Sequence, residues 1–164
     1  VGPDQVPLSL SRARRESSTY CRFYGASRMG SIRREIVTSA APHLVWDAIR
    51  DVGALHTRLV PGFVVDTRLE PDARARVVTF GNGMVVREPI VAIDDEARRL
   101  VWGAEGGPLT HYNGSVQVFA DGPGSRVVWI ADFLPHEAAG AIGPMIEQGM
   151  AVMKTTLDAL ASSE

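Results

Sequence analysis

The sequence predicts an α+β fold in which a curved, seven-stranded antiparallel sheet wraps around one long C-terminal helix. Six runs rich in β-branched and aromatic residues follow one another between residues 63 and 134, with short gaps between them. Short gaps favour antiparallel neighbours, because parallel strands need long crossover connections. From about residue 135 to residue 161, apolar residues instead recur at helical spacing.

The N-terminal part of this fold is predicted to hold one strand and two short helices. Ile32–Thr38 reads as the first strand, and Ala54–Leu59 as the second helix. Between them, Pro42 suits the first turn of a helix and Gly53 suits its end. The apolar positions of that helix are Val45, Trp46, Ile49 and Val52.

Turn residues separate the six later strands. Gly, Pro, Asn and Asp dominate every gap, because they adopt or stabilise the backbone conformations of tight turns. The predicted strands are Phe63–Leu69, Arg74–Phe80, Met84–Ile93, Arg99–Ala104, Leu109–Ala120 and Arg126–Leu134.

The long helix is predicted from Pro135 to Ala161. Glycines and Pro144 weaken its first half, so we expect a kink or loop before Met145. Gly149 lacks a side chain on the stripe that faces the sheet, which predicts extra space there, lined by Met145 and Met153. From periodicity alone, ordinary core packing is the simpler explanation. The stripe comprises Met145, Gly149, Val152, Met153, Thr156, Leu157 and Leu160.

The composition is that of one globular domain. The 164 residues carry a formal net charge of −2, so the composition lacks the excess of positive charge that is typical of nucleic-acid-binding proteins. A single cysteine, Cys21, excludes an intramolecular disulfide, and no Cys/His cluster has metal-ligand spacing, so neither a metal nor another cofactor is predicted. No apolar run approaches the ~18 residues of a membrane-spanning helix.

Residues 1–28 differ from the rest of the chain. They are rich in serine and arginine, show no sustained periodicity and lack the apolar core of a secretory signal. We therefore expect a disordered or non-native extension before a domain of residues 29–164, and a cytoplasmic location. A basic arm that binds an acidic partner is the alternative.

Glu88 shares a strand face with apolar residues, where an unpaired carboxylate is costly; these are Met84, Val86, Ile90 and Ala92. Counting outward from Asn82 places Arg76 opposite Glu88 in the hairpin, so the two are predicted to pair. The pair is either a structural ion pair, an anchor for a polar ligand group or an acid/base couple. Tyr112 faces the same side and either joins the pair or satisfies a backbone group. Trp102 and Trp129 are candidates for an apolar wall.

The sequence resembles the START/Bet v 1-like (SRPBCC) superfamily, in particular its bacterial polyketide cyclase/dehydrase-like proteins. The resemblance covers residues 32–161 and implies a helix-grip fold with a cavity between the sheet and the C-terminal helix. Superfamily members include binders, carriers, receptors and enzymes, so the resemblance names no single activity. It is carried by Val45–Asp51, Val86–Glu88, Ile93–Leu100, Gly106–Leu109, Tyr112, Val128–Trp129 and Phe133.

Two plant relatives add detail to this resemblance. In the onion lachrymatory-factor synthase an acid, a tyrosine and an arginine are thought to act together, and by motif they match Glu88, Tyr112 and Arg76. The two mobile loops of the abscisic-acid receptors match Gly81–Met84 and Gly106–Leu109. The chain departs from those receptors, because it lacks their pocket lysine and their proline-containing gate.

Two classes of function follow. The first is binding of a small apolar or amphipathic molecule, such as a lipid, in the cavity. The second is a cofactor-independent cyclase, dehydrase or isomerase with Glu88 as acid/base and Tyr112 and Arg76 beside it. A weaker idea is a signalling protein that reports ligand occupancy, and a homodimer is compatible with all three. The expected ligand-binding residues are Arg76, Val78, Phe80, Val86, Glu88, Ile90, Trp102, Leu109, Tyr112, Trp129, Phe133, Met145, Gly149 and Met153.

Overall fold

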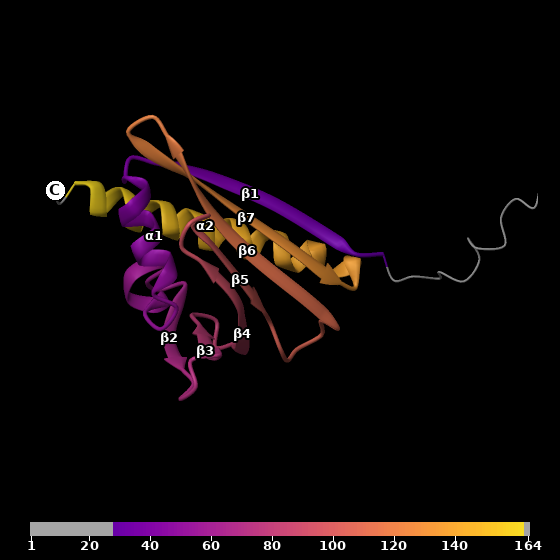
Figure 1. The fold of residues 1–164 in the computed structure, drawn as a ribbon. Coiled ribbons are helices and arrows are strands. Elements are labelled where there is room, and N and C mark those ends of the chain that lie inside the picture. Colours follow the sequence, from indigo (N-terminus) through magenta and orange to yellow (C-terminus); the bar gives the residue numbers. More distant parts are fainter. Residues whose placement is uncertain (1–27, 163–164) are drawn as a thin grey trace, which may run out of the picture.

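The computed structural model describes residues 28–162 and contains one seven-stranded sheet with a long helix along one face (Figure 1). The strands are antiparallel in the order β1-β7-β6-β5-β4-β3-β2. This arrangement confirms the predicted α+β helix-grip fold. The elements are β1 Gly30–Thr38, α1 Pro42–Arg50, the π-helical turn η1 Leu55–Leu59, β2 Val64–Leu69, β3 Ala75–Phe80, β4 Val85–Asp94, β5 Arg99–Gly103, β6 His111–Asp121, β7 Gly124–Leu134, the 3-10 turn η2 His136–Ala138 and α2 Ala139–Ala161.

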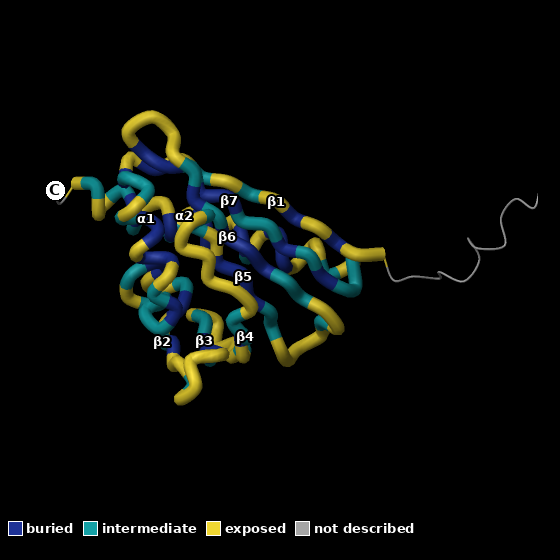
Figure 2. Tube along the Cα trace, in the orientation of Figure 1, coloured by how far each residue is buried: buried dark blue, intermediate teal, exposed yellow. Residues whose placement is uncertain are grey.

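The core lies between the concave face of the sheet and α2. Along α2 the buried side chains recur three or four residues apart, the spacing that aligns them on one helix face. In Figure 2 the tube is accordingly dark blue, for buried residues, where the strands cross α2, and yellow, for exposed residues, at the turns. The buried apolar residues of α2 are Ile142, Ile146, Met150, Met153 and Leu157.

The expected kink or loop before Met145 is not a loop in the structure. Helix α2 continues from Ala139 through Pro144, after the short turn η2. Ile142 and Ile146, one turn apart on either side of Pro144, are 6% and 0% exposed. Burial of this face therefore outweighs the weak helix propensity of the glycines and the proline.

The hairpin of β3 and β4 has the predicted register, with Arg76 opposite Glu88. Farther along β4, a bulge between Ile90 and Ala92 shifts the register against β5. Because a bulge turns the following side chains away from the regular alternation, Ala92 is exposed rather than inward. The expectation that Ala92 shares the inner face of Glu88 is wrong for this reason.

The predicted N-terminal extension of residues 1–28 lies, apart from Arg28, outside the described residues. Within residues 28–162, none of the helices has the length and apolar character needed to cross a membrane.

Candidate functional site

A cavity of about 250 Å³ lies between the sheet and α2. Its walls come from α1, η1, strands β2 to β7, η2 and α2. Nearly all the lining side chains are apolar, and among residues 28–162 the only ionisable ones are Arg76, Glu88 and Tyr112. The cavity is thus an apolar chamber with one polar region.

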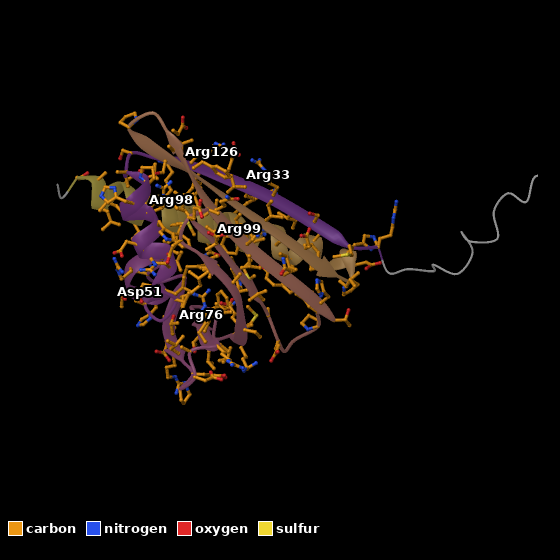
Figure 3. All side chains as sticks on the ribbon, viewed as in Figure 1. Arg33, Asp51, Arg76, Arg98, Arg99 and Arg126 are labelled. Atoms are coloured by element: carbon orange, nitrogen blue, oxygen red, sulfur yellow. The ribbon has the colours of Figure 1, made fainter. Side chains whose placement is uncertain are left out.

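Arg76 and Glu88 form an ion pair across the β3–β4 hairpin. Nε of Arg76 lies 2.7 Å from Oε2 of Glu88, and the two side chains are only 4% and 9% exposed. Arg76 also donates from Nη1 to the backbone carbonyl of Val52, at 3.2 Å. Its guanidinium carbon lies 5.9 Å from the ring centroid of Trp102, within cation–π range. Figure 3 shows Arg76 at the β2–β4 end of the sheet.

Each partner of this ion pair keeps one polar group unused. Among residues 28–162, Oε1 of Glu88 and Nη2 of Arg76 have no hydrogen-bond partner. Both residues line the cavity. The pair therefore presents one acceptor and one donor to whatever enters, while its net charge stays near zero.

Tyr112 is the third polar group of the cavity. Burial raises the pKa of its phenol, and the negative charge of Glu88 raises it further. The nearby indole N–H of Trp129 acts in the opposite direction. That N–H is buried, yet it has no acceptor with satisfactory hydrogen-bond geometry among the described residues. The phenol is therefore a neutral O–H donor, and the buried indole N–H of Trp129 lacks a protein acceptor.

Two aromatic pairs shape the apolar walls. Trp102 and Trp129 meet edge to face at a centroid distance of 5.4 Å, and Phe63 and Phe80 do the same at 5.4 Å. A Cβ on Gly114 would lie 2.7 Å from the Trp102 ring and 3.0 Å from the Tyr112 ring. The absence of a side chain at Gly114 thus lets both rings lie flat against β6.

The two loops singled out in the sequence meet at the edge of this cavity. Met84 lines it from the β3–β4 turn, and Gly106 to Leu109 line it from the β5–β6 loop. Gly106 and Gly107 have φ values of 98° and 78°, in the left-handed region that favours glycine. The loop conformation that borders the cavity therefore depends on these glycines.

Of the fourteen residues expected to bind ligand, ten line this cavity. They are Arg76, Phe80, Val86, Glu88, Trp102, Leu109, Tyr112, Trp129, Met145 and Met153. Their contact with a ligand stays a prediction.

Four expected residues do not line the cavity, each for a steric reason. The ring of Phe63 fills the space opposite Gly149, where a Cβ would lie 3.0 Å from Cε1. Phe133 is fully buried and packs over Gly30, on β1. Val78 is fully buried in the core, and Ile90 lies at the β4 bulge.

The second short helix and the segment after it also line the cavity, which the sequence did not predict. Leu55 and Leu59, four residues apart, line the cavity from η1. Val60 and Phe63 line it from the segment between η1 and β2. The spacing of the two leucines was a signal that this helix has an apolar face. By contrast, neither His56 nor His136 lines the cavity.

Among residues 28–162, no group of three or more His, Cys, Asp or Glu side chains is arranged to hold a metal ion. The polar region of the cavity offers one carboxylate, one guanidinium and one phenol. This set can hydrogen-bond a ligand oxygen or exchange a proton with it.

Residues 29–163 match the family described as polyketide cyclase/dehydrase and lipid transport. The protein XoxI from Bacillus cereus has a similar fold, with a TM-score of 0.70, 18% identity and coverage of 78% of this chain and 95% of that one. Norcoclaurine synthase from Thalictrum flavum, solved with dopamine and hydroxybenzaldehyde, gives a TM-score of 0.65 and 20% identity over 84% of this chain and 88% of that one. Ara h 8.0201 also has a similar fold, with a TM-score of 0.63 and 16% identity over 84% of this chain and 100% of that one. No curated protein matches the chain.

Proposed function

Because the chain belongs to the polyketide cyclase/dehydrase and lipid transport family, we propose that it binds a small, largely apolar molecule in the cavity between sheet and α2. The observation that carries the proposal is the contrast between the apolar walls and the single polar region of Arg76, Glu88 and Tyr112. Such a pattern is typical of sites where apolar walls supply affinity and a few polar groups fix orientation.

The size of the cavity favours a small ligand. Its volume of about 250 Å³ is just below the roughly 300–1,000 Å³ of pockets for drug-sized molecules. A ligand with one or two rings or a short chain fits this space better than a whole membrane lipid. A longer chain would need to extend past the edge formed by Met84 and Leu109.

The charges of the cavity favour a neutral ligand. Arg76 and Glu88 neutralise each other, and the phenol of Tyr112 stays protonated because its pKa is raised. A charged ligand would therefore lose its hydration without gaining a counter-ion. A carbonyl or hydroxyl oxygen is instead well matched to the hydroxyl donor of Tyr112 and the unused Nη2 of Arg76.

Ligand binding is tested by displacement of an apolar fluorescent dye and by native mass spectrometry of the gently purified protein. We expect dye binding in the wild type and its loss in Ala104→Trp, which places a large ring in the cavity. Ala92→Trp is the matched control, because Ala92 is exposed and lies outside the cavity. Equal dye binding by the two variants would contradict the proposed site.

A second candidate function rests on the unused oxygen of Glu88. A carboxylate that faces an apolar cavity can take a proton from a carbon next to a substrate carbonyl and return it at another carbon, which is an isomerisation. Meanwhile Tyr112 would donate a hydrogen bond to the oxygen on which charge develops. Norcoclaurine synthase, an enzyme by its name, has a similar fold, so the fold is compatible with catalysis.

Catalysis by Glu88 is tested with a neutral ketone substrate in which an enolisable hydrogen is replaced by deuterium. Wild-type protein should accelerate exchange of that deuterium with water, and Glu88→Gln should abolish the acceleration while the dye still binds. Tyr112→Phe, which keeps the ring, should retain exchange at a reduced rate. Exchange that survives in Glu88→Gln would remove Glu88 as the base.

The cytoplasmic location and the homodimer stay predictions from the sequence. Size-exclusion chromatography with light scattering at two protein concentrations tests the homodimer.

A further inference from the structure

The outer face of the sheet, opposite α2, holds a groove of about 480 Å³ lined by arginines. Side chains alternate across a strand, and Trp129 of β7 points into the inner cavity, so its neighbours Val128 and Ile130 point outward. Arg33, Arg99 and Arg126 come from β1, β5 and β7 and lie over these strands in Figure 3. This groove is therefore separate from the proposed ligand cavity.

The strand register explains why the three arginines surround one spot. One row across the sheet reads Arg99, Gln117, Val128, Glu35. The next row on one side includes Ser115, Ile130 and Arg33, and the row on the other side includes Phe119 and Arg126. The three guanidinium groups thus approach Gln117 and Val128 from three directions.

The groove carries more positive than negative charge. Within residues 28–162, Glu35 is the one carboxylate that forms ion pairs with these arginines: it bonds Arg33 and lies 3.5 Å from Nη1 of Arg126. Arg126 also stacks on Phe119, with its guanidinium carbon 4.8 Å from the ring centroid. The guanidinium of Arg99 forms no ion pair or hydrogen bond with any described residue, although Asp94 lies opposite Arg99 in the β4–β5 ladder. With Glu35 and Asp94 counted against the three arginines, the groove keeps a net positive charge.

The floor of the groove has unused polar groups beside apolar ones. Ser115 is 7% exposed, and its hydroxyl makes no hydrogen bond with the described residues. Gln117 donates from Nε2 to the carbonyl of Ala97, at 3.1 Å, which holds its amide in place. Next to them, Val128 is only 6% exposed and Ile130 is partly buried. A ligand in the groove would meet a hydroxyl donor, guanidinium groups and an apolar surface.

We propose that this groove binds the phosphate group of a small organic phosphate ester. Planar guanidinium groups bind phosphate oxygens in pairs, and the net positive charge of the groove favours a phosphate anion. The organic part of the ester would pack on Val128 and Ile130. Glu35 occupies Arg33 and Arg126 when the groove is empty, so it competes with the ligand.

Isothermal titration of the full chain with phenyl phosphate at low ionic strength tests this proposal. We expect one saturable site, weakened about 5- to 20-fold in Arg99→Ala through loss of a charge-assisted hydrogen bond. Glu35→Gln should tighten binding by about 3- to 10-fold, because it frees the other two arginines. Inorganic phosphate should bind more weakly than phenyl phosphate, since it cannot use the apolar floor.

The matched control is Arg74→Ala, which removes one exposed arginine that has no ion pair among the described residues and lies outside the groove. It should leave the affinity for phenyl phosphate within about twofold of wild type, as expected for a distant, screened charge. Equal losses in Arg99→Ala and Arg74→Ala would mean that only net charge matters and would overturn the site. Dye binding in the inner cavity should not change in Arg99→Ala, so the two proposals fail independently.

Two sources supply such a phosphate group, a soluble ester and a lipid headgroup. Sedimentation with vesicles that contain phosphatidic acid separates them. If phenyl phosphate binds and the vesicles do not, the ligand is a soluble ester. If the vesicles bind wild type but not Arg99→Ala, the headgroup is a ligand as well. Failure of both probes to bind would overturn the proposal.

Discussion

Nε of Arg76 lies 2.7 Å from Oε2 of Glu88, directly across the β3–β4 hairpin and inside the wall of an apolar cavity. Both side chains are nine-tenths buried. Desolvation makes such a pair costly to form, yet removal of one member leaves the other charge buried alone. Substitution of either residue is therefore expected to change both the polar groups of the cavity and the stability of the hairpin.

Glu88→Gln should lower the free energy of unfolding by about 3 kcal/mol, because Arg76 would lose its buried counter-ion. Urea denaturation followed by far-UV circular dichroism measures this change. Glu105→Gln is the control, since it removes a carboxylate from the exposed pair with Arg87 and should cost at most about 1 kcal/mol. The double variant Arg76→Leu/Glu88→Leu should lie within about 1 kcal/mol of wild type. A double variant less stable than Glu88→Gln would contradict this account.

Gly114→Ala should destabilise the protein by about 2 kcal/mol, through overpacking of a buried strand face. The added Cβ would lie 2.7 Å from the ring of Trp102, which is 4% exposed. Trp102 and Tyr112 must then move into the cavity, so dye affinity should fall as well. Gly140→Ala is the control, because a Cβ there meets nothing within 4 Å. Unchanged dye affinity in Gly114→Ala would mean that the rings do not shape the binding space.

The sequence predicted the antiparallel pairing of the six later strands and the Arg76–Glu88 pair because both follow from local rules. Turn residues set the hairpins, and counting from Asn82 set the register. The boundary of the cavity was harder to predict, since it depends on side chains that meet from distant elements. The space expected at Gly149 is filled by Phe63, which lies 86 residues earlier in the chain. Similarly, periodicity alone gave no sign of the bulge that turns Ala92 outward.

Asp158 links the C-terminal half of α2 to the end of β1. Its carboxylate accepts hydrogen bonds from Lys154 and from the hydroxyl of Thr38, both at 2.7 Å. These contacts, that of Lys154 first, lower the pKa of Asp158 to about 2. Because the side chain is 37% exposed, Asp158→Asn should cost only about 1 kcal/mol at neutral pH.

The stabilisation by Asp158 should depend on pH in a known direction. A carboxyl whose pKa is lowered by folding stabilises the protein above its unfolded pKa, near 3.9. That stabilisation is lost as the pH falls from there through the folded pKa of about 2. The stabilities of wild type and Asp158→Asn, measured in urea, should therefore converge in this interval. Asp121→Asn, in the exposed β6–β7 turn, is the control and should show no such convergence.

Tyr112 should show the opposite dependence, at alkaline pH. Burial and the charge of Glu88 raise the pKa of the phenol, so the folded state holds this proton after an unfolded tyrosine has lost it. Stability due to Tyr112 is then complete below about pH 10, the unfolded pKa, and declines as the pH rises further. Wild type should lose stability faster than Tyr112→Phe in that range.

Urea denaturation of wild type and Tyr112→Phe at a series of pH values from neutral to alkaline measures this difference. Lysine and the other tyrosines titrate in the same range, but they contribute equally to both proteins and cancel in the difference. Parallel curves would mean that the phenol ionises in the folded state as freely as in the unfolded chain. A steeper decline of the wild type would instead mean that Tyr112 keeps its proton at every physiological pH. In that case it can only donate its hydroxyl hydrogen to a ligand oxygen or accept a hydrogen bond, and Glu88 is the one carboxylate in the cavity left to move a proton.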